Sequence, residues 1–298
     1  MKAIVVRETG DSSVLKVENL PVPEPKDNEV LIKVHACGVC FHDVVTRNGT
    51  LRRGIKMPLI PGHEISGEIV AIGESVIDFK IGDKVATTQR HHICGHCKWC
   101  RGGKETLCPE ARVLGDYGLN GGYAEYVVVE EDNLALVPEG VSLDEAAIAA
   151  CAVGTELNAI REIGNLVLGE RVLVTGAGGG IGIHGVQIAK SAGGFVICVT
   201  TSSSKVDVIK DAGADVVILI EKGEEFSKKV KEVTNGYGVD LIIDNVGTPV
   251  FNSVRKSLAL GGRWIVVGQL SGEFVKFNPA QFFLKGNSIF SAMSTTRQ

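Results

Sequence analysis

The chain has 298 residues, of which 44% are hydrophobic and 22% charged, a composition that is ordinary for one large or two average globular domains. Its formal net charge of -4 at pH 7 gives no reason to expect a nucleic acid or an acidic membrane as a partner. No apolar stretch is long enough to span a bilayer and the start, MKAIVV, lacks a signal-peptide layout, so we expect a cytoplasmic protein.

Residues 1–150 have the pattern of a β-rich first domain. Short apolar and β-branched runs, such as Val30–Val34, Gly67–Ile72 and Tyr126–Val129, are separated by the Gly, Pro and Asp residues that favour turns. This pattern predicts a barrel-like domain of short strands. The first helical signal follows at Leu143–Ala147, where Ser142 is suited to cap the helix.

Four cysteines lie close together in the first domain. Two C-x2-C steps and a further cysteine place four thiols within fifteen residues, which is the spacing of a metal site rather than of a disulfide framework. Zinc favours a closed tetrahedral shell of four thiolates, and such a shell leaves no position for a substrate. We therefore predict a structural zinc ion bound by Cys94, Cys97, Cys100 and Cys108.

From Arg171 onward the pattern changes to alternating strands and helices. Most of the predicted strands are apolar on both faces, as in a parallel sheet that helices cover on both sides. Six strands are the full number of a doubly wound dinucleotide-binding sheet, so the fold class is α/β. The predicted strands are Arg171–Thr175, Phe195–Thr200, Val216–Leu219, Leu241–Asn245, Trp264–Gly268 and Ser288–Phe290.

A glycine-rich turn follows the first of these strands and precedes the helical run Ile183–Lys190. Such a turn lets the backbone approach a pyrophosphate, which then lies at the free N–H groups of the helix N-terminus. The position between a buried strand and a helix indicates dinucleotide binding rather than a plain structural turn. The residues assigned to this cofactor are Gly176, Gly179, Gly180, Ile181 and Gly182, together with Val246 and Gly247 after the fourth predicted strand and Val267 and Gly268 at the end of the fifth.

The end of the second predicted strand bears on the choice between NAD and NADP. A carboxylate there would bind the ribose 2′-hydroxyl and repel a 2′-phosphate, but no acidic residue occurs before Asp207. Hydroxyl groups and a lysine can hold a phosphate, so the sequence favours NADP over NAD. The alternative is that these residues only cap the next helix. The residues concerned are Thr200, Thr201, Ser202 and Lys205.

Taken together, these features resemble the medium-chain, zinc-containing alcohol dehydrogenase family over the whole length from Met1 to Gln298. The resemblance implies a GroES-like catalytic domain over residues 1–150 and a Rossmann dinucleotide-binding domain over 151–298. It also implies a small-molecule substrate and a homo-oligomer, a dimer or tetramer, paired through the sixth strand. The further matching segments are Cys37–Asp43, Pro61–Glu64, Gly121–Tyr126 and Cys151–Thr155.

The resemblance implies a second, catalytic zinc ion, bound by Cys40, His63 and Cys151, which no local spacing reveals. Two thiolates and an imidazole leave a fourth coordination position open for water or a substrate oxygen. By the same resemblance Glu64 is an alternate ligand or an outer partner, and Asp43 orients the imidazole of His63. The side chain that packs near the nicotinamide is that of Thr155.

Three features depart from the family pattern. His42 stands where the family commonly has a serine or threonine that relays a proton, and an imidazole can serve the same role. Arg90, His91 and His92 replace an apolar or aromatic segment and favour a polar or anionic substrate. The final return of the chain to the catalytic domain is missing, so we expect an exposed edge in the first domain.

Two enzymatic hypotheses and one non-enzymatic hypothesis follow. The leading one is a zinc-dependent oxidoreductase that transfers a hydride between an alcohol–carbonyl pair and a nicotinamide cofactor, which the complete zinc triad favours. The alternative is an NADPH-dependent reductase of activated C=C bonds, such as an acryloyl-CoA-like enoyl-CoA reductase or a quinone reductase. A zinc-ribbon module without catalysis is disfavoured, because such modules have two separated C-x2-C pairs and nucleic-acid binders a basic face.

Overall fold

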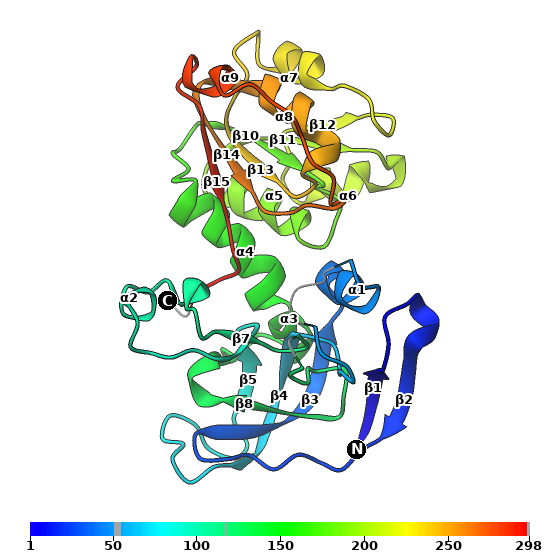
Figure 1. Cartoon of the computed structure of the whole chain (residues 1–298). Helices are drawn as coiled ribbons and strands as arrows, with labels where there is room; N and C mark the ends of the chain where they lie inside the picture. Colours follow the sequence, from blue (N-terminus) through cyan, green and yellow to red (C-terminus); the bar gives the residue numbers. More distant parts are fainter. Residues whose placement is uncertain (51–54, 117, 297–298) are drawn as a thin grey trace. The chain divides into compact units, whose positions relative to one another are not determined.

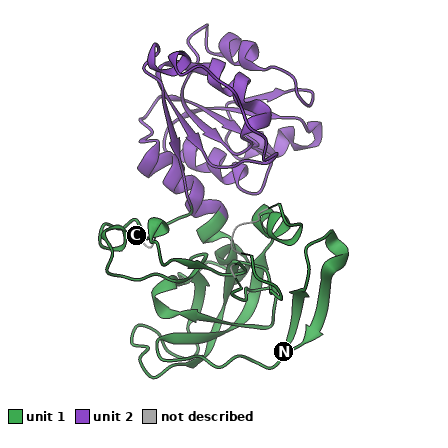
Figure 2. Ribbon diagram, in the orientation of Figure 1, with its two compact units in different colours: residues 1–151, 294–298 green, residues 152–293 purple. Residues whose placement is uncertain are grey.

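The computed structural model describes residues 1–50, 55–116 and 118–296. The chain divides into two compact units, Met1–Cys151 with Ser294–Gln298, and Ala152–Met293 (Figure 2). The sequence assigns the stretch after Met293 to the second domain, whereas in the structure it groups with the first unit. A hydrogen bond of 3.1 Å from Arg90 Nη1 to the carbonyl of Thr295 contributes to this grouping.

The first unit is built around an antiparallel sheet with the strand order β8-β3-β4-β5-β9 (Figure 1). Its core is formed by alternate residues, such as Val30 and Ile32 on β3 and Val127 and Val129 on β8, because successive side chains of a strand point to opposite faces. A β1–β2 hairpin and the short β6–β7 pair complete the β structure. The strands are β1 Lys2–Val6, β2 Leu15–Asn19, β3 Glu29–Gly38, β4 Glu64–Ile72, β5 Lys84–Thr87, β6 Arg90–His92, β7 Arg112–Val113, β8 Tyr126–Glu130 and β9 Leu134–Leu136.

Among the described residues of this unit there are three short α-helices, α1 (Phe41–Arg47), α2 (Lys98–Arg101) and α3 (Leu143–Ala147). The predicted cap of α3 is confirmed. Ser142 Oγ accepts a hydrogen bond of 3.3 Å from Glu145 N, and Glu145 Oε2 accepts one of 3.0 Å from Ser142 N. This reciprocal capping box satisfies two N–H groups that the first helical turn leaves without partners.

The second unit contains a six-stranded parallel sheet with the order β12-β11-β10-β13-β14-β15 and helices on both faces (Figure 1). This order is that of a doubly wound dinucleotide-binding sheet, so the predicted fold class is confirmed. The strands are β10 Arg171–Thr175, β11 Phe195–Thr200, β12 Val216–Leu219, β13 Val239–Asp244, β14 Leu258–Val266 and β15 Ser288–Ser291, and the helices are α4 Gly154–Leu157, α5 Gly182–Ser191, α6 Val206–Asp211, α7 Ser227–Val233, α8 Phe251–Ser257 and α9 Ala280–Phe283.

The fifth strand is longer than the sequence predicts. Pairing of β13 with β14 extends back to Val239 and Leu258 through a register shift, a local irregularity that hydrophobic periodicity does not reveal. The two faces of the sheet bury separate clusters. On β10, Val172 and Val174 pack with residues of α5, whereas Leu173 packs on the other face with residues of α7 and α8.

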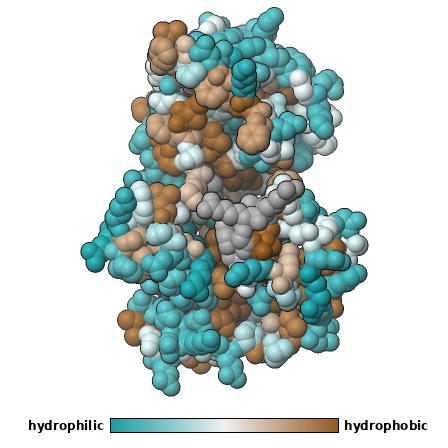
Figure 3. Space-filling model, viewed as in Figure 1, coloured by the Kyte–Doolittle hydropathy of each residue, from teal (hydrophilic) through white to brown (hydrophobic). Residues whose placement is uncertain are grey.

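Within the described part of the chain, no helix is long and apolar enough to cross a membrane. Hydrophilic and hydrophobic residues are irregularly mixed over the face that Figure 3 shows. The helix finding agrees with the sequence, which has no apolar stretch of the required length.

Candidate active site

The four clustered cysteines come together in the loop that contains α2. The Sγ atoms of Cys94 and Cys100 lie 3.9 Å apart and those of Cys97 and Cys100 lie 3.5 Å apart, with all four sulfur atoms within 4.8 Å of one another. Tetrahedral bonding at about 2.3 Å to zinc requires sulfur–sulfur distances of roughly 3.8 Å. The arrangement, with Cys108 as the fourth member, fits a zinc ion and not a disulfide, in which sulfurs are about 2.05 Å apart.

Backbone N–H groups point at these sulfur atoms. The amides of Cys97 and Cys100 each donate a hydrogen bond of 3.4 Å, to Cys94 Sγ and Cys97 Sγ respectively. The hydrogen bond from the Cys100 amide is the largest cause that lowers the pKa of Cys97, to about 7. Donors of this kind stabilise the thiolate form that a metal ion requires.

A second cluster of donor atoms brings together residues that are far apart in the sequence. Cys40 directly precedes α1, His63 and Glu64 lie at the start of β4, and Cys151 lies in a π-helical segment, Ala149–Val153. One donor atom of each lies within 4.8 Å of the others. The Sγ atoms of Cys40 and Cys151 are 3.8 Å apart, the distance expected for two thiolates on one zinc ion. The donor set therefore fits zinc.

Asp43 fixes the orientation of His63. Asp43 Oδ1 lies 3.3 Å from Nδ1 of His63 and accepts a hydrogen bond of 3.2 Å from Gly62 N. Asp43 Oδ2 accepts hydrogen bonds from Cys40 N at 3.0 Å and from the hydroxyl of Tyr123 at 2.9 Å. The carboxylate cannot turn away without losing these donors, and the imidazole is left with Nε2 for the cluster. Tyr123 lies in a segment that the sequence matched, but nothing in its spacing assigned it this role.

The proton affinities of the cluster follow from these contacts. Burial opposes the charged form of His63, but its hydrogen bonds to Asp43 and Cys40 prevail and raise the pKa of His63 to about 10. The hydrogen bond between the two cysteines lowers the pKa of Cys40 and raises that of Cys151. Burial also raises the pKa of Glu64. His63, Cys151 and Glu64 thus hold protons that a bound metal ion would displace.

His42 lies beside this cluster. Its ring meets the ring of His63 edge to face with centroids 5.3 Å apart, and its Nε2 lies 3.2 Å from Oδ2 of Asp116. Asp116 is almost fully buried, whereas the side chain of His42 is 35% exposed. The histidine therefore connects a buried carboxylate with the protein surface. Sequence reasoning missed Asp116, because it lies 74 residues away in a loop without a recognisable motif.

The polar segment Arg90–His92 does not form a free cationic surface. Its side chains lie against carboxylates of the same unit, with Arg90 3.6 Å from Glu105, His91 3.4 Å from Glu29 and His92 2.8 Å from Glu130. These contacts account for the polar character of the segment within the first unit. They give no support to the expectation of an anionic substrate at this place.

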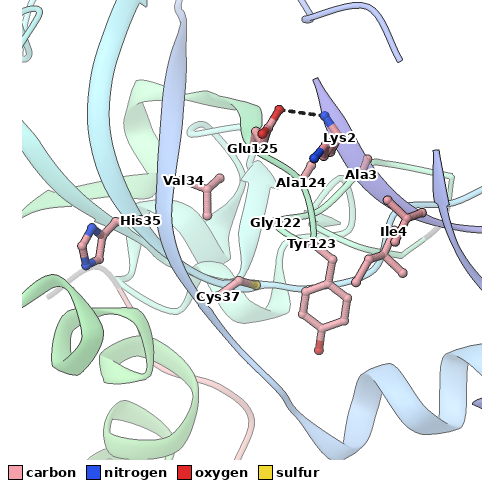
Figure 4. Close-up of a pocket in the computed structure, with 11 residues that line it drawn as sticks. Lys2, Ala3, Ile4, Val34, His35, Cys37, Gly122, Tyr123, Ala124 and Glu125 are labelled. Carbon is pink, nitrogen blue, oxygen red and sulfur yellow. Dashed lines mark hydrogen bonds between the residues drawn. The ribbon is translucent and has the colours of Figure 1, made fainter. Parts of the chain in front are cut away.

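A separate hollow of the first unit is lined by Tyr123 and Cys37 (Figure 4). Burial raises the pKa of Cys37 to about 12, so its thiol is held in the neutral form. The hollow adjoins the cluster at Tyr123, whose hydroxyl bonds to Asp43. We assign it no chemistry.

The predicted dinucleotide-binding residues gather at the carboxyl ends of the parallel strands of the second unit. Gly176 follows β10 with φ +62°, and its carbonyl accepts a hydrogen bond of 2.9 Å from Gly179 N. A side chain on Gly182 would collide with the carbonyl of Gly176, so the tight turn requires glycine there. Gly180 and Ile181 complete the turn before α5, Val246 and Gly247 follow β13, Val267 and Gly268 follow β14, and Thr155 lies in α4.

The residues after β11 form a polar edge close to this turn. Thr200 Oγ1 accepts a hydrogen bond of 3.2 Å from Ser202 N, and Ser202 Oγ lies 2.9 Å from Ser204 Oγ. Lys205 Nζ donates a hydrogen bond of 2.6 Å to the carbonyl of Gly178. Lys205 is thereby held at the glycine-rich turn, while Thr201 is exposed.

Two family models match the chain. Residues 26–139 match the alcohol dehydrogenase GroES-like domain, and residues 180–298 match the zinc-binding dehydrogenase domain. The chain belongs to the medium-chain, zinc-containing alcohol dehydrogenase family. It is therefore an oxidoreductase, as the sequence predicts. The family membership and the donor sets agree on zinc as the metal.

Similar members of the family divide between the two predicted reactions. An acryloyl-coenzyme A reductase of Sulfurisphaera tokodaii is 38% identical over 100% of this chain and 86% of its own. The solved structure of AibC is 43% identical with a TM-score of 0.93, covering 100% of this chain and 82% of AibC. A solved NAD-dependent alcohol dehydrogenase is 34% identical with a TM-score of 0.93, covering 99% and 85%. These relatives support neither reaction over the other, nor the preference for NADP.

Proposed function

We propose that this family member transfers a hydride between an alcohol–carbonyl pair and a nicotinamide dinucleotide, with a catalytic zinc ion at Cys40, His63 and Cys151. The observation that carries the proposal is the convergence of these three residues and Glu64, whose donor atoms lie within 4.8 Å of one another. Three separate segments of chain bring two thiols, an imidazole and a carboxyl group to one point, which a plain core has no reason to do.

A zinc ion at this site supplies Lewis acidity toward the oxygen of the substrate. Asp43 holds His63 in one tautomer and one orientation, since it contacts Nδ1. His42 carries the proton of the reaction. Because its Nε2 is directed at Asp116, its Nδ1 is the nitrogen left to exchange that proton, and its partial exposure gives the proton a route to water.

The dinucleotide binds at the carboxyl ends of β10, β11, β13 and β14. The N-terminus of α5 presents free N–H groups to the pyrophosphate, and the glycine-rich turn lets the backbone approach it. Lys205 and the hydroxyls after β11 favour a 2′-phosphate, and hence NADP over NAD. The cluster at Cys94 holds a second zinc ion that stabilises its loop without taking part in the reaction.

The second candidate is the reduction of an activated C=C bond in an enoyl thioester. It is favoured by the 38% identity with an acryloyl-coenzyme A reductase over the whole chain. It is also compatible with the pair of His42 and Asp116, which can deliver a proton to the carbon next to the thioester while the hydride adds to the other alkene carbon.

One substrate panel separates the two candidates. Turnover of NADPH and NADH is measured with alcohols, aldehydes and enoyl thioesters for the wild type, for Cys40→Ser and for the control Cys198→Ala, a buried thiol of β11. We expect alcohol–aldehyde turnover that Cys40→Ser reduces at least about 100-fold and Cys198→Ala leaves in place. Enoyl reduction that is indifferent to Cys40→Ser, without alcohol turnover, would overturn the proposal.

A further inference from the structure

The second unit contains a fully buried carboxyl group that has no ion-pair partner among the described residues. Glu156 on α4 has an exposed fraction of 0%. Cations of the adjacent elements pair elsewhere, Lys190 of α5 with Asp215 and Arg171 of β10 with Asp240. The other charged or titratable side chains on the elements around it are His184 on α5, Asp244 on β13, and Arg161 and Glu162, which pair with each other after α4.

The contact that Glu156 makes is with the amide of Asn245, just after β13. Asn245 Nδ2 donates hydrogen bonds to Glu156 Oε1 at 2.9 Å and to the carbonyl of Thr175 at 3.2 Å. Since a carbonyl can only accept, Thr175 fixes which end of the amide is nitrogen. Both N–H bonds of the Asn245 side-chain amide then have acceptors.

Two buried oxygen atoms of this same pair are left without a hydrogen-bond partner among the described residues. They are Oε2 of Glu156 and Oδ1 of Asn245. Two acceptors cannot satisfy each other, and leaving both unpaired inside the protein is costly. A single proton on Oε2 supplies the donor that Oδ1 lacks.

We propose that Glu156 is a neutral carboxylic acid in the folded protein and that it forms a two-bond acid–amide pair with Asn245, which positions the dinucleotide-binding turn. Desolvation supports the neutral form, because burial raises the pKa of Glu156 to about 8 against a smaller opposing effect of the Asn245 hydrogen bond. The inference rests on the proposed binding of a dinucleotide by this unit.

The pair connects the segments that would hold the cofactor. Asn245 N donates a hydrogen bond of 3.1 Å to Thr175 Oγ1, the residue directly before the turn at Gly176. A side chain on Gly185 would come within 2.8 Å of the carboxyl carbon of Glu156, so this carboxyl lies against the backbone of α5. Thr155, expected beside the nicotinamide, is its neighbour in the chain. Glu156 is therefore a positioning residue.

The test uses Glu156→Gln, Glu156→Ala and the wild type, with dissociation constants for NADPH and NADH measured calorimetrically between pH 6 and 9.5. The glutamine amide can donate from Nε2 to Asn245 Oδ1 and accept at Oε1 from Asn245 Nδ2 at every pH, so it reproduces both bonds of the pair without a titratable proton. We expect wild-type binding to weaken as pH rises through 8, by about 30-fold at pH 9.5, as the neutral fraction falls. Glu156→Gln removes this dependence, and Glu156→Ala binds at least about tenfold more weakly at every pH.

Equal pH profiles for the wild type and Glu156→Gln would overturn the inference. So would a loss of binding in Glu156→Gln as large as in Glu156→Ala. Melting temperatures measured over the same pH range serve as an independent readout. If no variant binds a dinucleotide, the proposed function fails, and the pair is still tested by whether Glu156→Gln removes the alkaline fall in melting temperature that the wild type shows.

Discussion

Replacement of Tyr123 by phenylalanine removes one of the donors that hold Asp43 against His63. The lost hydrogen bond is 2.9 Å long and its acceptor is a buried carboxylate. A hydrogen bond to a charged group is worth about 1.5–3 kcal/mol. Because Asp43 keeps its bonds to Cys40 N and Gly62 N, we expect only part of this energy to reach the metal site, a loss of about tenfold in zinc affinity.

The backbone of Tyr123 stays anchored in this variant. Its amide donates a hydrogen bond of 3.0 Å to Pro61, and its carbonyl accepts one of 2.8 Å from Ile4, so the fold is expected to persist. Zinc affinity is measured by competition with a chromophoric chelator. Cys40→Ser, which leaves only the four-cysteine site, identifies the phase that belongs to the catalytic site.

The matched control is Tyr126→Phe, which removes a hydroxyl of β8 that does not bond to Asp43. If both variants bind zinc as the wild type does, while Asp43→Asn weakens binding, the reasoning about the Tyr123 hydroxyl is refuted. A larger loss in Tyr126→Phe than in Tyr123→Phe would refute it as well.

Three further predictions concern the other sites. Cys97→Ser is expected to lower the zinc content from two ions per chain to one, and to lower the melting temperature, as measured by elemental analysis and calorimetry. Gly182→Ala is expected to weaken NADPH binding at least about tenfold in calorimetric titration, since its methyl group meets the carbonyl of Gly176. Because the pKa of Glu156 in the folded protein, about 8, lies above its ordinary value of 4.5, its contribution to stability is full below pH 4.5 and is lost as pH rises to about 8. The wild type should thus lose up to about 5 kcal/mol of unfolding free energy over this range relative to Glu156→Gln in denaturant titrations, and parallel curves would contradict this.

The strands of the second unit could be predicted closely from the sequence, because the central ones, β10, β11 and β13, are buried on both faces and read as continuous apolar runs. β10, β11 and β12 begin and end where the apolar runs do. The start of β14 at Leu258 could not be predicted, since it depends on a register shift against β13 that involves backbone pairing rather than side-chain pattern.

The four-cysteine site is formed by residues close together in the chain, so its spacing is visible in the sequence. The second donor cluster is formed by residues far apart in the chain, so no spacing reveals it. Cys40 and Cys151 are separated by 111 residues, and only the resemblance to a known family linked them before the structure was considered. Asp116 and the acid–amide partner of Glu156 depend on tertiary contacts without any motif. Such partners are found by following buried polar atoms, not by reading spacings.

The most direct test of the proposed function is the turnover of an aldehyde with NADPH before zinc removal, after it, and after zinc is added back. We predict that turnover is lost when the zinc bound by Cys40, His63 and Cys151 is removed and returns when that site is refilled. Full turnover by protein that retains no zinc at this site would contradict the proposal.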